Sequence, residues 1–170
     1  MDTMVDIFIE RANDELLLAK RLKTITESDE IKDYLKIPRN KTFYSSVISH
    51  AYYSIFYSAK AILLTKNIKT SSPNVHKKTY DKFEETFVDT GILDVSLLII
   101  YEEMIIKADQ LLEIFKEEKW KRGHFTYQTI PQANRDPADV SLKNATKFLT
   151  NINKVIKSEK EKEEKKNKES

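Results

Sequence analysis

Apolar side chains recur along most of this chain at spacings of three and four residues, the period of an amphipathic α-helix. In residues 3–23 the apolar stripe consists of Val5, Phe8, Ala12, Leu16, Ala19 and Leu22. The pattern stops in residues 26–40, where Pro38 disfavours helical geometry at the residue before it. We therefore expect a first helix over residues 3–23, followed by no more than a short helical turn.

Residues 42–67 are apolar on two sides at helical spacing. One side carries Tyr44, Val47, Ala51, Ile55, Ser58 and Ile62, and the other carries Tyr53, Phe56, Tyr57, Leu63 and Leu64. A helix at the surface of a bundle needs one apolar face, so a helix with two needs neighbours on both sides. This segment is therefore predicted to be the central helix of the fold.

A third helix is predicted to end at Gly91, because glycine readily adopts the left-handed conformation that stops a helix. It begins with Ser72 as the N-cap and Pro73 at the first helical position. Its apolar face reads His76, Tyr80, Phe83 and Phe87.

The fourth and fifth helices have apolar positions that alternate between spacings of four and three, which is typical of a bundle seam. The fourth is capped by Asp94, ends near Gly123 and carries Leu97, Tyr101, Met104, Ala108, Leu111 and Phe115. The fifth begins with Asp136 as the cap and Pro137 as the first helical residue, and carries Ala138, Leu142, Ala145, Leu149, Ile152 and Ile156.

Composition agrees with an all-α fold, because two Gly and four Pro in 170 residues are too few for a sheet with many hairpins. We predict a five-helix bundle with an up-and-down four-helix core and a long charged C-terminal helix or tail. Residues 1–156 form one domain in this interpretation. Residues 157–170 contain no apolar side chain and are predicted to be a solvated extension or a frayed helix.

Several classes of function are excluded by what the sequence lacks. The chain has no cysteine, which removes disulfides, thiolate chemistry and the usual structural zinc sites. Neither glycine lies in a GxGxxG or GxxxxGK pattern, so nucleotide binding by a Rossmann or P-loop motif is excluded. The three histidines form no HExxH pair, and we expect neither a metal nor a cofactor.

No stretch approaches the roughly 18 uninterrupted apolar residues of a membrane helix, and the N-terminus has no signal-length apolar run. We therefore expect a cytoplasmic protein without membrane contact. The net charge of +2 is too small to indicate a class of partner, so any site for nucleic acid depends on a local patch of basic residues.

Such a patch occurs in residues 119–137, KWKRGHFTYQTIPQANRDP, where the regular apolar spacing is interrupted. Cationic side chains alternate there with aromatic ones: Lys119, Lys121 and Arg122 with Trp120, Phe125 and Tyr127. Cations neutralise phosphates and aromatic rings stack on bases, so the mixture suits RNA or a nucleotide. The structural alternative is a helix end, with basic residues offsetting the dipole, Gly123 as the stop and the rings packing on the bundle.

Three segments together resemble the HEPN-domain superfamily. Its central helix is resembled by residues 49–64, SHAYYSIFYSAKAILL. Its third helix is resembled by residues 75–94, VHKKTYDKFEETFVDTGILD, and its last helix by residues 139–152, DVSLKNATKFLTNI. The resemblance implies a five-helix bundle that forms a homodimer. It also implies a toxin component paired with a small nucleotidyltransferase and, in active members, a metal-independent RNase.

The RNase motif of that superfamily is Arg, four to six variable residues and then His, and this chain departs from it. Arg122 and His124 are separated by one residue, and Tyr127 stands where the motif would allow His. Arginine suits a phosphate and histidine suits proton transfer near neutral pH, so these two residues are the candidate catalytic pair. Lys121, Trp120, Phe125 and Tyr127, together with Arg122, are the candidate ligand-binding residues.

Three hypotheses remain open from the sequence. The first is a toxin component with residual or absent RNase activity, and the second is a non-catalytic HEPN module that binds a nucleotide, RNA or a protein. The third is a helical adaptor that uses the charged C-terminal helix. His76 is interpreted as a hydrogen-bonded core histidine, and His50 as a polar contact in the core or at a dimer interface. Tyr52, Tyr53 and Tyr57 are typical of core and could also line a pocket.

Overall fold

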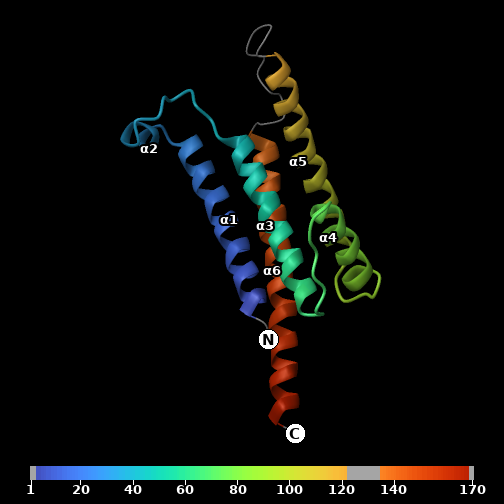
Figure 1. The fold of residues 1–170 in the computed structure, drawn as a ribbon. Coiled ribbons are helices and arrows are strands. Elements are labelled where there is room, and N and C mark those ends of the chain that lie inside the picture. The colour runs from blue at the N-terminus through green and yellow to red at the C-terminus, as the bar shows by residue number, and fades with distance from the viewer. Residues whose placement is uncertain (1–2, 122–134, 169–170) are drawn as a thin grey trace.

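The computed structural model describes residues 3–121 and 135–168, which contain helices and no strands (Figure 1). The predicted all-α class is confirmed. The elements are α1 (Thr3–Glu27), α2 (Asp29–Tyr34), α3 (Tyr44–Leu64), α4 (Val75–Phe83), a π-helical turn (Glu84–Val88), α5 (Val95–Lys121) and α6 (Arg135–Lys168). Helices α1, α3, α5 and α6 run alternately up and down, as predicted for the bundle core (Figure 1).

Helix α3 is the centre of the fold and packs against α1, α4, α5 and α6. Both of its predicted apolar sides are largely buried, and Ile55, Phe56 and Leu63 are at most 5% exposed. Small residues bring its neighbours close: the Ser54 hydroxyl, fully buried, donates to the Ala12 carbonyl of α1 at 2.8 Å. The prediction was wrong for Tyr53, whose side chain is 39% exposed because this turn of α3 borders a cavity.

Helix α1 continues to Glu27, four residues beyond the predicted end. Its last turn is supported by an ion pair between Lys23 and Glu27 at 2.6 Å, the i, i+4 spacing that stabilises helices. Ser28 then caps the short helix α2 by accepting the Ile31 N–H. The short helical turn expected before Pro38 is therefore a separate helix.

The start of α4 differs from the prediction, because Ser72 is not its cap. The Ser72–Pro73 peptide is cis, and the helix begins at Val75 after Asn74, whose φ is 58°. Asparagine tolerates this left-handed conformation better than most residues, which places the turn there. The other end agrees with the prediction: Gly91 has φ 71°, and its N–H donates to the Val88 carbonyl.

Helices α5 and α6 complete the core. The Asp94 carboxylate accepts the Ser96 N–H at 2.8 Å, which confirms it as the cap of α5. Helix α6 begins at Arg135, one residue before the predicted cap, so Asp136 lies in its first turn. The Arg135 guanidinium pairs there with Glu27 of α1 at 3.2 Å.

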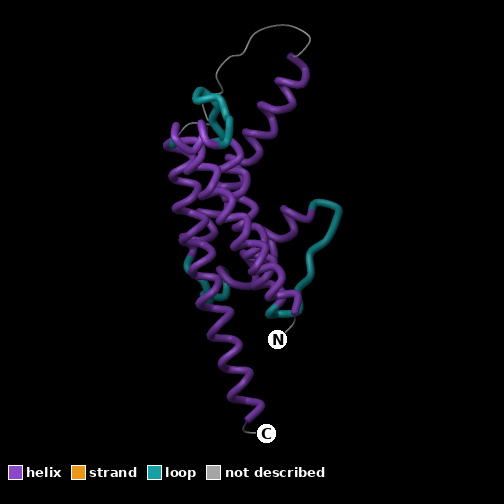
Figure 2. Tube along the Cα trace, turned by 90° about the vertical axis from the view of Figure 1, so that its left-hand side faces the viewer, coloured by secondary structure: helices purple, strands orange, loops and turns teal. Residues whose placement is uncertain are grey.

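Helix α6 continues through Lys168 and extends beyond the N-terminal end of α1 (Figures 1 and 2). Ion pairs anchor this part: Lys160 with Asp6 at 2.6 Å and Lys66 with Glu159 at 2.7 Å. Within the described ranges, no helix combines the length and the apolarity needed to cross a membrane.

Candidate functional site

The residues that the sequence singled out are at the end of α5 and beyond it. Arg122, His124, Phe125 and Tyr127 lie outside the described residues. Trp120 and Lys121 belong to the last turn of α5, and their side chains are also outside the described part. The predicted site therefore stays a prediction, placed between the end of α5 and the start of α6.

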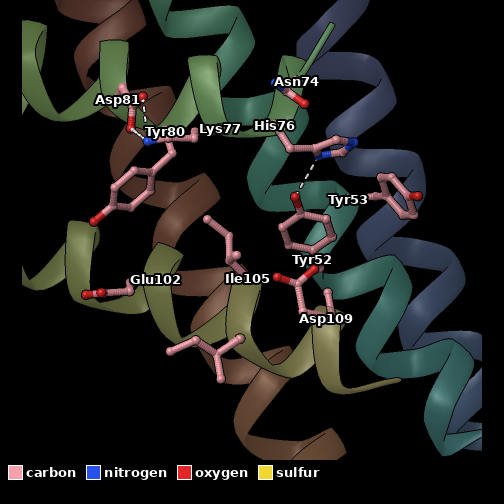
Figure 3. Close-up of a pocket in the computed structure, with 12 residues that line it drawn as sticks. Tyr52, Tyr53, Asn74, His76, Lys77, Tyr80, Asp81, Glu102, Ile105 and Asp109 are labelled. Carbon is pink, nitrogen blue, oxygen red and sulfur yellow. Dashed lines mark hydrogen bonds and ion pairs between the residues drawn. The ribbon is translucent and has the colours of Figure 1, made fainter. Parts of the chain in front are cut away.

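A cavity of about 610 Å³ opens between α3, α4 and α5 in the described part of the chain (Figure 3). Three tyrosines and a histidine form much of its wall, and three carboxylates and one lysine line it as well. The lining residues are Tyr52, Tyr53, Asn74, His76, Lys77, Tyr80, Asp81, Glu102, Ile105, Ile106, Ala108 and Asp109. Of the three tyrosines whose role the sequence left open, Tyr52 and Tyr53 line this cavity, whereas Tyr57 stacks on Phe8 of α1.

Tyr52 and His76 form the polar centre of the cavity wall. The Tyr52 hydroxyl lies 2.6 Å from His76 Nδ1, and the imidazole stacks on Phe56 with ring centroids 4.2 Å apart. His76 is nevertheless exposed at the surface of α4, so its interpretation as a core histidine was wrong. The hydrogen-bond prediction holds, and the ring lines the cavity at the start of α4 (Figure 3).

Protonation states in this pair follow from burial. Burial raises the pKa of the Tyr52 phenol, and the nearby Tyr53 and Asp109 raise it further, so the phenol keeps its proton. Burial lowers the pKa of His76; the charge of Asp109 opposes this in part, and the charge of Lys60 adds a smaller lowering effect. At neutral pH the hydrogen bond therefore joins a neutral phenol to a neutral imidazole, and the tautomer of that imidazole decides which of the two donates.

The carboxylates of the cavity differ in their pairing. Asp81 is bound by the Lys77 ammonium at 3.0 Å to each oxygen. Glu102 and Asp109 have no hydrogen bond or ion pair with another described residue. The charges that line the cavity are thus one closed ion pair and two carboxylates available to a ligand.

Beneath the cavity lies the phenol of Tyr101, which is fully buried on α5. Its ring meets the Tyr80 ring edge-on, with centroids 5.5 Å apart. Among the described residues its hydroxyl finds no hydrogen-bond partner. Burial raises the pKa of Tyr101 well above its ordinary value, and the phenols of Tyr52 and Tyr80 add to that effect.

A second polar cluster joins α1 to α3. Glu15 is only 6% exposed, and its carboxylate contacts Arg11 at 2.9 Å and His50 Nδ1 at 2.5 Å. His50 is half-buried, which agrees with its interpretation as a polar contact of the bundle. Because Glu15 lies on α1 and His50 on α3, this contact holds the two helices together.

Sequence reasoning missed Tyr80, Glu102 and Asp109 as members of one site. Glu102 is an exposed residue of α5. No spacing within a single helix could indicate that α4 and α5 bring these side chains to one cavity. In the described part of the chain, His, Asp and Glu form no group of three that could hold a metal ion.

Comparison with known proteins gives two relatives, both from the archaeon Methanocaldococcus jannaschii. The protein named "Putative toxin MJ0142" is 34% identical over 109 residues, which are 61% of this chain and 67% of the relative. The protein named "Putative toxin MJ0605" is 30% identical over 122 residues, which are 72% of this chain and 78% of the relative. No protein-family model matches the chain, and no solved structure matches it. At this identity and coverage, the chain belongs to the same family as these two archaeal proteins named as toxins.

Proposed function

We propose that this protein is the HEPN-type toxin component of a toxin–antitoxin pair, and that it binds RNA or a nucleotide through residues 119–137. The observation that carries the proposal is its membership of a family whose two named relatives are described as toxins. The partner in this proposal is a small nucleotidyltransferase, and the protein itself acts as a homodimer.

The packing of α3 supports the HEPN part of the proposal. The residues that carry the resemblance, 49–64, lie in the helix that packs against all four of its major neighbours. The third-helix resemblance includes Gly91, which has the left-handed conformation that stops a helix. The described residues form six α-helices, one more than the resemblance implies, because the short α2 is a separate helix.

The altered motif determines which activity we expect. Metal-free RNA cleavage needs a base at the 2′-hydroxyl and a cation at the phosphate, held in a fixed relation. Arg122 and His124 have suitable side chains, but only one residue separates them, whereas four to six residues separate the Arg and His of the superfamily's motif. The two side chains are therefore held in a different relation. The form of the proposal that this spacing favours is a module that binds RNA with little or no cleavage.

The first test measures RNA binding and cleavage in the same samples. Labelled RNA is incubated without metal with the wild type, with Arg122→Ala, with His124→Ala and with Lys154→Ala as a control on the exposed side of α6. We expect binding that weakens with salt and with Arg122→Ala, little cleavage, and no effect of Lys154→Ala. Wild-type cleavage lost in both site variants would instead assign RNase activity, and absence of any binding would refute the RNA site.

The second test addresses the toxin role. The protein is expressed from a tightly controlled promoter in a bacterial host, alone and together with the product of the adjacent reading frame. We expect expression alone to stop growth and a neighbouring nucleotidyltransferase to restore it. Normal growth with abundant protein present would contradict the toxin assignment.

A further inference from the structure

We propose that the cavity between α3, α4 and α5 binds a linear aliphatic polyamine, with one ammonium group at Asp109 and another at Glu102. This inference is independent of the RNA site, because it uses only the cavity described above. The ligand proposed for the cavity is a cation, whereas the RNA or nucleotide proposed for residues 119–137 is an anion.

The charges of the cavity select a cation. Lys77, the lysine that lines it, pairs with Asp81 at 3.0 Å, so the described lining offers a phosphate no unpaired cation. Glu102 and Asp109 both line the cavity without an ion-pair partner among the described residues. His76 is neutral near pH 7 for the reasons given above, so it does not repel a positively charged ligand.

The aromatic and aliphatic side chains that line the cavity favour an ammonium ion carried on a flexible apolar chain. The faces and edges of Tyr52, Tyr53 and Tyr80 surround the cavity, and Ile105 lies between the two carboxylates on α5 (Figure 3). Aromatic faces attract ammonium ions through the ring quadrupole, and they also shield methylene groups from water. A metal ion would gain nothing from these walls, because it requires several oxygen ligands at short distance.

The spacing of the carboxylates selects a ligand with two charged ends. Glu102 and Asp109 are seven residues apart, which is two turns on the same face of α5 and about 10 Å along the helix axis. A single ammonium group cannot contact both carboxylates at that separation. An extended diamine or spermidine can contact one carboxylate with each end while its methylenes cross Ile105 and the tyrosine rings.

Calorimetric titration of the purified full chain, freed of nucleic acid, tests the proposal. The probes are spermidine, 1,8-diaminooctane, ethylenediamine and n-butylammonium. The two long probes are expected to bind about two- to fivefold more tightly than the other two, since ethylenediamine is too short and butylammonium has one charge, so each loses one of the two exposed ion pairs. Butylammonium also stands in for a lysine side chain of a protein partner, so equal affinity for it and spermidine would overturn the two-ended site.

Variants locate the binding. Glu102→Gln and Asp109→Asn each remove one carboxylate from an exposed position and are expected to weaken spermidine binding about two- to fivefold, as for a partly exposed ion pair. Tyr53→Leu keeps an apolar side chain but removes the aromatic ring, and it is expected to weaken spermidine binding by a similar factor. Glu103→Gln, which removes the same charge from the neighbouring exposed residue, is the matched control.

The outcomes separate the possibilities. Loss of affinity in the three cavity variants with Glu103→Gln unchanged supports the site. Equal loss in all four variants would show that spermidine responds only to overall charge, and that would overturn it. Absence of spermidine binding by the wild type would also overturn it, while leaving the RNA test unaffected.

Discussion

Removing the hydroxyl of Tyr101 should stabilise this protein, although the residue is fully buried in its core. The hydroxyl oxygen has no hydrogen-bond partner among the described residues, so it has lost its bonds to water without replacement. The ring itself packs edge-on against Phe83 and Phe148, with centroids 5.9 and 5.7 Å away, and Tyr101→Phe keeps these contacts. The substitution therefore removes an unsatisfied polar group and little else.

The magnitude follows from the cost of burying such a group, which is about 1–3 kcal/mol. We expect Tyr101→Phe to increase the free energy of unfolding by about 1 kcal/mol or more. For a chain of this size, each kcal/mol corresponds to a rise in Tm of about 2–4 °C. Urea denaturation followed by circular dichroism measures the change, with an unchanged m-value as the check that the same transition is observed.

Tyr52→Phe is the matched comparison, because it removes the same atom from a phenol that is also buried. The Tyr52 hydroxyl shares a hydrogen bond with His76 Nδ1 at 2.6 Å, so its removal leaves Nδ1 without that partner. We expect a loss of about 0.5–1.5 kcal/mol, opposite in sign to the Tyr101 result. Destabilisation by Tyr101→Phe of similar size would show that its hydroxyl has a partner, such as a buried water, and would refute the reasoning.

Three further predictions concern other parts of the fold. Burial lowers the pKa of His76 in the folded state, against a smaller opposing effect of Asp109 and with a small contribution from Lys60, so the unfolded chain binds more protons. The resulting stability is fully present above the ordinary pKa of 6.5 and is lost as the pH falls through the lower folded pKa. Urea denaturation at several pH values should show this loss, with a flatter profile for His76→Gln. Glu15→Gln should lower the free energy of unfolding by about 1–3 kcal/mol at neutral pH, because it removes a buried carboxylate that contacts Arg11 and His50. An unchanged free energy of unfolding would mean that this cluster makes no net contribution to stability. Gly91→Ala should cost about 1–2 kcal/mol from backbone strain alone, since an added Cβ meets no atom within 4 Å, and Gly91→Asn should recover part of it.

The central helix was predictable because its sequence contains the information locally. Two apolar sides at helical spacing require neighbours on both, and α3 has them whatever the order of the other helices. The cap of α5 was predictable for the same reason, since Asp94 acts on an N–H two residues away. Ser72 failed as a cap because Asn74, two residues later, adopts the left-handed conformation from which α4 starts.

The cavity could not be predicted, because it depends on how three helices are placed relative to one another. Tyr52 belongs to α3, His76 to α4 and Asp109 to α5, and each position fits the ordinary pattern of its own helix. The aromatic stripe on α3 looks the same whether a neighbouring helix covers it or a cavity borders it. Only the packing of α4 and α5 distinguishes core tyrosines from cavity tyrosines.

Helix α5 carries two regions of opposite chemistry, and this separates the two proposed sites. In its middle, Glu102 and Asp109 face the cavity without partners among the described residues, whereas its sequence ends in a basic stretch from Lys119 onward. The regions are more than one helical turn apart and act on their surroundings over a range that salt limits to about 10 Å. A phosphate at the basic region and an ammonium at the acidic region are therefore largely screened from the opposite region. The RNA binding and the polyamine binding that we propose use different residues, so either proposal can fail without the other.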